Sequence, residues 1–203
     1  MIQVITVERE YGSQGAMYAR HLAEHLKWEM VDQCLIDEVA KRANVSAATA
    51  QRCDEQLDPW YNKMGRAFWH GSNERATSLM EQQVFDATRM TEILRNVMRE
   101  KAQAGKCVIV GRGAACALHG IPGCFHVFVY ASMARKIRWF EQTFHEKAHL
   151  AERELLATDR RRADYIAHFY QNVWNDYRLY HLMLNSCMGF EAMIGATIEA
   201  TGI

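Results

Sequence analysis

Short apolar runs alternate with stretches of helical periodicity along this chain. Apolar and β-branched residues dominate IQVITV at 2–7, CVIV directly after Lys106, and FHVFVY at 125–130. Runs of this length, bounded by glycine or charged residues, predict buried strands. Two further strands are predicted at WEMVD (28–32) and YHLMLNS (180–186).

Helical spacing fills the segments between these strands. A helix is expected to begin near Gly15, with Ala19, Leu22 and Leu26 on one face. Strands that alternate with helices indicate an α/β fold in which a parallel sheet is covered on both faces. The other expected helices cover about 33–43, a segment from the N-cap Ser46 toward Leu57, and about 74–104, 132–146, 150–169 and 190–200.

Length and composition favour one compact domain over residues 1–203. Hydrophobic residues make up 49% of the chain, and 24 basic residues balance 24 acidic ones. This neutral balance gives no overall field for nucleic acid or an anionic membrane, so neither is an expected partner. No targeting leader and no run near the roughly 20 apolar residues of a membrane span is evident, which favours a cytoplasmic protein. The scattered cysteines are expected to be reduced and buried: Cys34, Cys53, Cys107, Cys116, Cys124 and Cys187.

A long polar segment between Asp58 and Gly105 lacks convincing strands and is expected to form a helical insertion at about 58–104. Its Trp60, Phe68 and Trp69 suit either packing against the core or an open binding wall. Exposed aromatic residues of this kind would also suit a partner subunit, so a homodimer is a possible assembly.

The stretch EREYGSQGAMYAR, at 8–20, joins the first strand to the first helix. Gly12 and Gly15 would let the backbone approach a phosphate, and the Ser13 hydroxyl would be a hydrogen-bond donor. The stretch lacks the lysine of a phosphate-binding loop, because Gly15 stands at that position. Two interpretations therefore remain: a nucleotide cradle, or a tight turn that packs a helix on a strand.

Arginines elsewhere favour the nucleotide interpretation. Arg112 directly follows the CVIVG strand, at the sheet edge where ligands of parallel α/β proteins bind. Its planar fork suits a phosphate. Arg160, Arg161 and Arg162 are consecutive in a helical segment and point in different directions around it, which also suits a solvated face. Together with Arg9, these residues would supply the charge of the missing lysine.

Several segments resemble the cytidylate-kinase-like family, a branch of the nucleoside monophosphate kinases. They include ITVEREYGSQGAMYAR, CVIVGRGAACAL and FHVFVYAS, in the order and approximate spacing of that family. The most specific part is the C-terminal pattern D-x-x-R-A-x-Y, W-x-D and L-Y-x-L-x-L-N-S, here within 159–186. The resemblance covers nearly the whole chain.

This resemblance implies a three-layer P-loop kinase fold with a parallel sheet core, a nucleotide-monophosphate-binding insertion and a lid at about 145–165. The implied reaction transfers the γ-phosphoryl group of ATP, with Mg²⁺, to cytidine monophosphate or a related small acceptor. Small-molecule nucleotides are the implied partners. The implied catalytic residues are Arg112 and Arg162, the donor-phosphate residues are Arg9, Gly12, Ser13, Gln14 and Gly15, and the acceptor residues are Asp32, Arg112 and Asp159.

Three departures from the family pattern keep a non-catalytic, nucleotide-binding regulatory protein as an alternative. Gln14 stands where many members have glycine, and Val110 leaves VIVGRG without an acid for magnesium. Lys136 stands where relatives tend to have arginine, and a lysine lacks the bidentate fork.

The stretch HEKAH at 145–149 matches the zinc motif H-E-x-x-H. That motif needs His145 and His149 on one helical face, with Glu146 as the base. The longer zinc pattern fails, because position 152 is glutamate and position 155 is leucine. A zinc hydrolase is therefore a minor alternative.

Overall fold

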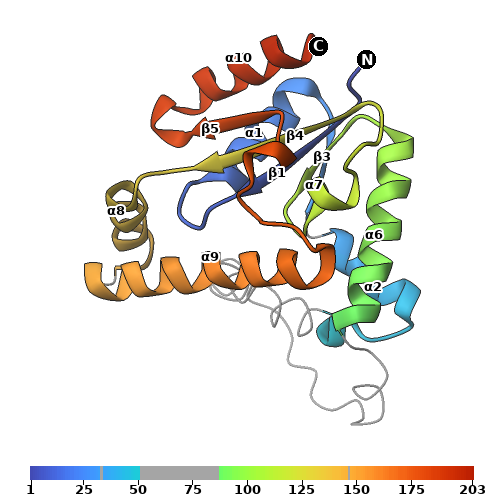
Figure 1. Ribbon diagram of the computed structural model, residues 1–203, viewed down its shortest axis with the longest axis horizontal. Helices are drawn as coiled ribbons and strands as arrows, with labels where there is room; N and C mark the ends of the chain where they lie inside the picture. The colour runs from blue at the N-terminus through green and yellow to red at the C-terminus, as the bar shows by residue number, and fades with distance from the viewer. Residues whose placement is uncertain (33, 51–86, 146) are drawn as a thin grey trace.

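The computed structural model describes residues 1–32, 34–50, 87–145 and 147–203. Within these residues, five parallel strands form one sheet in the order β2-β3-β1-β4-β5 (Figure 1). All the predicted strands are confirmed, with shifted ends. The strands are β1 (Val4–Arg9), β2 (Glu29–Val31), β3 (Cys107–Val110), β4 (Cys124–Tyr130) and β5 (Leu182–Asn185).

The helices follow the predicted periodicity closely. Ser46 is confirmed as an N-cap, because its Oγ accepts a hydrogen bond from the Thr49 N–H at 3.1 Å. The short α7 (Ala114–Ala117) and the 3₁₀ turns η1 (Tyr177–Leu179) and η2 (Ser186–Met188) were not predicted. The longer helices are α1 (Gly15–Leu26), α2 (Cys34–Ala43), α6 (Ala87–Ala104), α8 (Met133–Phe144), α9 (Ala148–Tyr170) and α10 (Phe190–Thr201).

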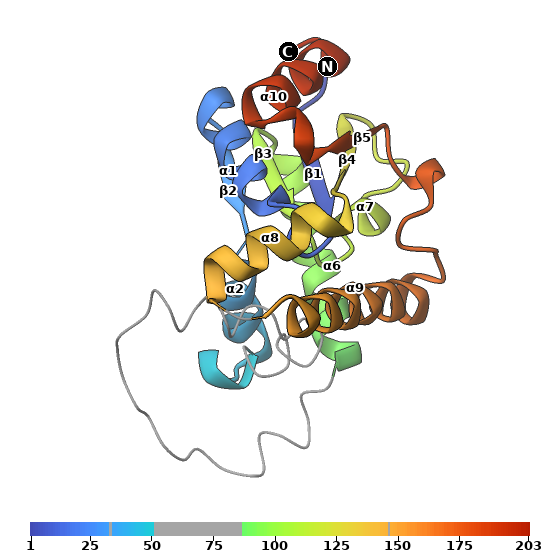
Figure 2. The same ribbon diagram turned by 90° about the vertical axis from the view of Figure 1, so that its left-hand side faces the viewer.

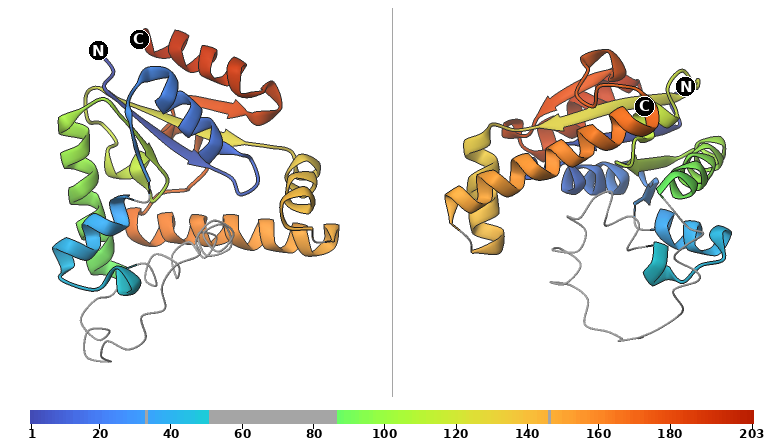
Figure 3. Two further views of the ribbon diagram at one scale, coloured as in Figure 1. Left: turned by 180° about the vertical axis from the view of Figure 1, so that it is seen from behind. Right: turned by 60° about the horizontal axis from the view of Figure 1, so that its bottom comes forward.

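Helices cover both faces of the sheet and make a three-layer domain. On one face α1 and α10 pack against each other and against apolar residues of β1, β3 and β4 such as Val7, Val110 and Val127 (Figure 3). On the other face α6 and α7 pack on the sheet, and α2 packs on α6. Burial on both faces explains why the strands read as continuous apolar runs.

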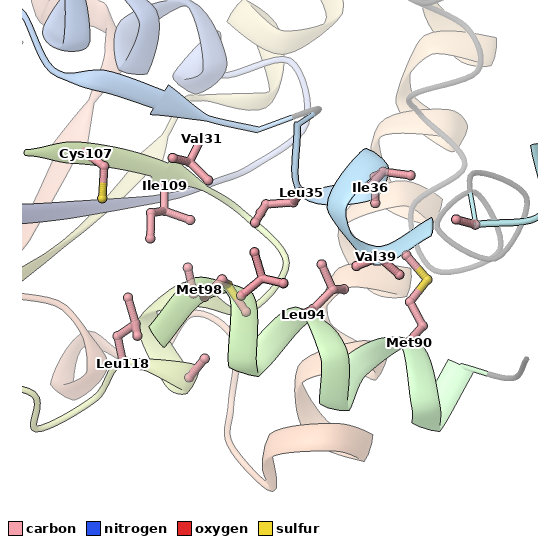
Figure 4. Close-up of a cluster of buried hydrophobic side chains, with 14 of the residues drawn as sticks. Val31, Leu35, Ile36, Val39, Met90, Leu94, Met98, Cys107, Ile109 and Leu118 are labelled. Atoms are coloured by element: carbon pink, nitrogen blue, oxygen red, sulfur yellow. The ribbon is translucent and has the colours of Figure 1, made fainter. Parts of the chain in front are cut away.

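The helix α6 belongs to the core rather than lying apart from it. Met90, Leu94 and Met98 recur along one of its faces and are fully buried against α2 and the sheet (Figure 4). This helix is the C-terminal part of the expected insertion at 58–104. Residues 58–86 of that insertion, including Trp60, Phe68 and Trp69, lie outside the described residues.

The helices α8 and α9 pack on each other at the edge of the sheet where the parallel strands end (Figure 2). The lid expected at 145–165 falls largely within α9, and its movement stays a prediction. No helix among the described residues combines the length and the apolar character that crossing a membrane requires.

The cysteines only partly follow expectation. Cys107 and Cys124 are free and buried, and burial raises the pKa of the Cys107 thiol to about 12. Cys116 is free and half-buried. The prediction is wrong for Cys187, which is exposed in η2 at the end of the edge strand β5. The Cys34 side chain and Cys53 lie outside the described part of the chain.

Candidate active site

The loop that joins β1 to α1 is a tight turn that hydrogen-bonds its own backbone. Gly12 and Gln14 have left-handed backbone conformations, with φ of +79° and +62°. The Ser13 hydroxyl donates to the Glu10 carbonyl at 2.8 Å and accepts from the Gly15 N–H at 3.3 Å. Ser13 is fully buried. Its hydroxyl, predicted to contact donor phosphates, therefore serves the loop itself in this structure.

Packing alone explains both glycines of this loop. A Cβ at Gly12 would lie 2.9 Å from Leu155 of α9 and 3.1 Å from Lys136 of α8. A Cβ at Gly15 would lie 2.5 Å from the Cβ of Arg9, where α1 begins over β1. The interpretation as a turn that packs a helix on a strand is thus supported at both positions, and phosphate binding by the loop stays a prediction.

A carboxylate from α9 contacts this loop directly. Asp159 accepts the Tyr11 N–H at 2.6 Å through Oδ1 and the Lys136 ammonium at 3.1 Å through Oδ2. Lys136 also pairs with Glu10 at 3.1 Å. Burial raises the pKa of Asp159, although Tyr11, Lys136 and Arg162 act to lower it. Asp159, predicted to bind the acceptor, therefore lies at the expected donor loop.

Apolar side chains of α8 and α9 cover the outer side of the loop. Tyr11, Phe140, Ala151 and Leu155 form a buried cluster. The ring of Trp139 meets that of Tyr11 edge-on, with centroids 5.7 Å apart. The loop is thus enclosed by protein on the side that α8 and α9 cover.

The three consecutive arginines of α9 have different surroundings. Arg162 is buried, and its guanidinium donates to the Arg9 carbonyl at 2.9 Å. Arg161 hydrogen-bonds within α9. The side chain of Arg160 is 84% exposed and lies 3.9 Å from Asp164. Consecutive side chains of an α-helix point in different directions, and of the three only that of Arg162 contacts the end of β1.

A second loop with positive φ follows β3 and carries Arg112. The φ angles at residues 111, 112 and 113 are +69°, +54° and +72°. The Arg112 guanidinium donates to the Asp32 carboxylate at 3.0 Å and to its carbonyl at 3.2 Å. The Arg112 side chain is 7% exposed and that of Asp32 is 19% exposed. The structure thus brings together two of the three residues predicted to hold the acceptor, whereas the third, Asp159, lies at the β1–α1 loop.

The two loops meet at Arg9, which is the last residue of β1 rather than part of the loop. A Cβ at Gly111 would lie 1.9 Å from a terminal nitrogen of Arg9, so glycine makes the space for this guanidinium. Arg9 is 4% exposed. Because β1 and β3 are neighbours in the sheet, Arg9 fills the space between the loops that follow them.

Glu8 is a site residue that the sequence analysis missed. It is 3% exposed, and its carboxylate accepts the Gly113 N–H at 3.1 Å and the Trp174 indole N–H at 3.4 Å. Burial raises the pKa of Glu8, whereas Arg9 and Arg162 lower it. The available signal was an acidic residue directly after the apolar run at 2–7, because such residues are rarely buried without partners.

The zinc alternative lacks the helix that it needs. His145 is the C-cap of α8 in a left-handed conformation, and α9 begins only at Ala148. His145 and His149 therefore do not share one helical face, and both are exposed. Glu146 lies outside the described residues. Within the described ranges, no group of three or more histidine, cysteine, aspartate or glutamate residues is arranged to hold a metal ion.

Comparisons with known proteins bear on the fold and on the family of this chain. Solved structures similar over the full chain include an uncharacterized protein from Eubacterium ventriosum, at 20% identity and a TM-score of 0.70, covering 99% of that chain. A shikimate kinase from Bacteroides thetaiotaomicron matches at 15% identity and a TM-score of 0.54, with all of both chains covered. A gluconokinase from Sinorhizobium meliloti matches at 10% identity and a TM-score of 0.52, covering 98% of this chain and 91% of that one.

These structural similarities show the fold, which is the P-loop kinase fold with its α/β three-layer core. No curated protein matches the sequence. The model of the cytidylate kinase-like family matches residues 4–187, which is most of the chain. This protein is therefore a member of the cytidylate kinase-like family.

Proposed function

We propose that this protein transfers the γ-phosphoryl group of ATP to cytidine monophosphate or a related small acceptor. The supporting observation is the Arg112–Asp32 pair beside the β1–α1 loop. Asp32 follows β2, Arg112 follows β3 and the loop follows β1, and these three strands are consecutive in the parallel sheet. Their carboxyl ends share one edge, so a donor at the loop would face an acceptor at Arg112.

The charges at this edge suit phosphoryl transfer, which depends mainly on positioning and neutralisation of charge. Arg112 would bind the acceptor phosphate through its fork, and Arg162 would stabilise charge on the transferring group. The N-terminus of α1 would direct its positive dipole end toward the donor. Bound ATP with Mg²⁺ would supply the phosphoryl group and screen its charge. Glu10 and Asp159, which both pair with Lys136, are two carboxylates close to the β1–α1 loop.

A regulatory protein that binds nucleotide without turnover is the second candidate. It is favoured by the enclosed loop, where Ser13 and Asp159 already satisfy the N–H groups of Gly15 and Tyr11. The loop also lacks the lysine of the usual motif.

A coupled assay that follows ADP formation from ATP and Mg²⁺ separates the two candidates. The purified protein is tested against a panel of nucleoside monophosphates and small hydroxyl acceptors such as shikimate and gluconate. Acceptor-dependent ADP formation with a nucleoside monophosphate supports the kinase. Nucleotide binding measured by calorimetry, without turnover across the panel, supports the regulatory protein.

Arg112→Lys tests the acceptor site within the same assay. This change keeps the charge but removes the bidentate fork, so we expect kcat/KM for the acceptor to fall by about 100-fold. The KM for ATP should change by less than about threefold. Arg178→Lys is the matched control, because Arg178 also pairs with an aspartate, Asp176, but on an exposed surface. Equal losses toward ATP and acceptor would contradict the assigned role.

A further inference from the structure

Three buried donors converge on the β1–α1 loop from three different elements. They are the Tyr11 backbone N–H in the loop, the Lys136 ammonium in α8 and the Arg162 guanidinium in α9. All three face the carboxylate of Asp159, at 2.6, 3.1 and 3.9 Å. Tyr11, Lys136 and Arg162 are each at most 6% exposed. Two cations and a backbone N–H around one oxyanion are also the chemistry of a phosphate site.

Asp159 balances the charge of this cluster. Glu8 accepts an N–H from the loop after β3, and Glu10 accepts the N–H of Ala131, directly after β4. Both glutamates are therefore tied to the sheet edge, whereas Asp159 belongs to α9. Among the described residues, three cations face three carboxylates, so departure of Asp159 would leave a net charge of +1. The cluster consists of Arg9, Lys136, Arg162, Glu8, Glu10 and Asp159.

We propose that Tyr11 N–H, Lys136 and Arg162 form an oxyanion site that Asp159 fills in the resting protein and that a nucleotide phosphate fills by displacing it. The nature of the ligand rests on the proposed function. The site itself rests on the geometry above. In this arrangement Lys136, from α8, provides the ammonium that the loop sequence lacks.

The covering helices make this exchange a conformational step. Leu155 of α9 packs so closely on Gly12 that an added Cβ would lie only 2.9 Å from it. No ligand therefore reaches this side of the loop while α9 stays in place. Displacement of Asp159 therefore requires α9 to shift from the loop. Only molecules in which Asp159 has left the site can bind the ligand. The apparent affinity is therefore the intrinsic affinity multiplied by the fraction of such molecules.

Coulomb's law favours the exchange once a phosphate arrives. Burial raises the pKa of Asp159 despite its three partners, which means that desolvation disfavours the ionised carboxylate at this position. A phosphate with two or more negative charges interacts with the same cations more strongly than a single carboxylate does.

Calorimetric titration with inorganic pyrophosphate tests the site without requiring catalysis. Asp159→Asn removes the charge but keeps an oxygen that accepts the Tyr11 N–H. We expect it to bind pyrophosphate about 10-fold more tightly than the original protein, or to bind where the original shows no binding. Asp164→Asn is the matched control, because it removes the same charge from an exposed position of the same helix. Its affinity should stay within about twofold of the original.

A second substitution shows whether the increase in pyrophosphate affinity depends on Lys136. The double variant Lys136→Met with Asp159→Asn should lose the increase in pyrophosphate affinity, because Lys136 is one of the two cations of the site. Urea unfolding verifies that each variant is folded, and Asp159→Ser replaces Asp159→Asn if the latter is not.

The outcomes separate this inference from the proposed function. Tighter pyrophosphate binding by Asp159→Asn supports the site even if the coupled assay shows no kinase activity. Unchanged or weaker binding overturns the site even if the original protein is an active kinase. Equal gains in Asp159→Asn and Asp164→Asn would also overturn it, because they would reflect overall charge alone.

Discussion

The loops after β1 and β3 turn through similar left-handed conformations, but they differ in what faces them. The loop after β1 lies under α8 and α9, and its Tyr11 N–H is taken by Asp159. The loop after β3 carries Arg112 outward to Asp32 at the end of the neighbouring strand. Glycine serves packing in the first loop, and at Gly111 it makes space for Arg9. A glycine-rich turn after a strand is therefore weak evidence for a phosphate loop until its neighbours are known.

The largest expected effect is the loss of the cation that binds the first loop to α9. Lys136→Met should lower the free energy of unfolding by about 3 kcal/mol, because it removes the buried ammonium that pairs with the partly buried carboxylates of Glu10 and Asp159. Urea unfolding measures this change. Lys101→Met is the control, since Lys101 pairs with Glu29 at 2.6 Å on the surface, where such a pair contributes at most about 1 kcal/mol. Similar losses of stability in both variants would show that Lys136 stabilises the enclosed loop no more than an exposed ion pair stabilises the surface.

The pH dependence of stability tests the other end of the sheet, where the strands begin, against the enclosed loop. His126, near the amino end of β4, is 1% exposed and lies beside Thr6, His119 and His181. Burial and the neighbouring histidines lower its pKa to about 4. The unfolded chain then binds more protons than the folded protein below pH 6.5, so stability is fully present above pH 6.5 and falls toward pH 4. The expected loss is up to about 3 kcal/mol.

Urea unfolding between pH 4 and 8 tests this assignment. His126→Gln should flatten the dependence between pH 6.5 and 4, whereas the exposed His145→Gln should leave it unchanged. Asp159 does not contribute a loss in this direction, because its pKa is raised rather than lowered in the folded protein. An unchanged acid dependence in His126→Gln would point to groups elsewhere, including those around the two loops.

The smallest of the three effects separates backbone strain from packing in the first loop. Gly12→Ala should lower the free energy of unfolding by about 2 kcal/mol, because it combines a positive φ with contacts to Leu155 and Lys136. Gly120→Ala is the control, since Gly120 has a φ of +74° and nothing within 4 Å of the added Cβ. It should cost about 1 kcal/mol, from strain alone. Equal losses of unfolding free energy in the two variants would show that α8 and α9 move aside for the added Cβ at Gly12 without a measurable loss of stability.

Much of the candidate site was predictable because it follows strand ends. Arg112 follows one predicted strand and Asp32 ends another, and parallel strands end at one edge, so their proximity follows from the fold class. The separation of the three arginines of α9 follows from 3.6 residues per turn. Arg160 is accordingly exposed and Arg162 buried.

The roles of Lys136 and Glu8 were not predictable in the same way. Lys136 attracted notice only as a departure from a family pattern, although its ammonium is buried between Glu10 and Asp159. Glu8 follows the run at 2–7 that predicts a strand, and its partners Gly113 and Trp174 lie far along the chain. Local patterns carry no information about such distant partners.

The sequence by itself determined the strands, the helices, the parallel sheet and the edge at which charged residues gather, because periodicity and strand ends are local properties. Only the tertiary structure decided that Asp159 contacts Tyr11 across 148 residues, that Lys136 supplies the ammonium, and that Leu155 covers Gly12. The physical reason is that periodicity shows which side chains share a face of a helix. What lies opposite that face depends on how α8 and α9 pack across the ends of the strands.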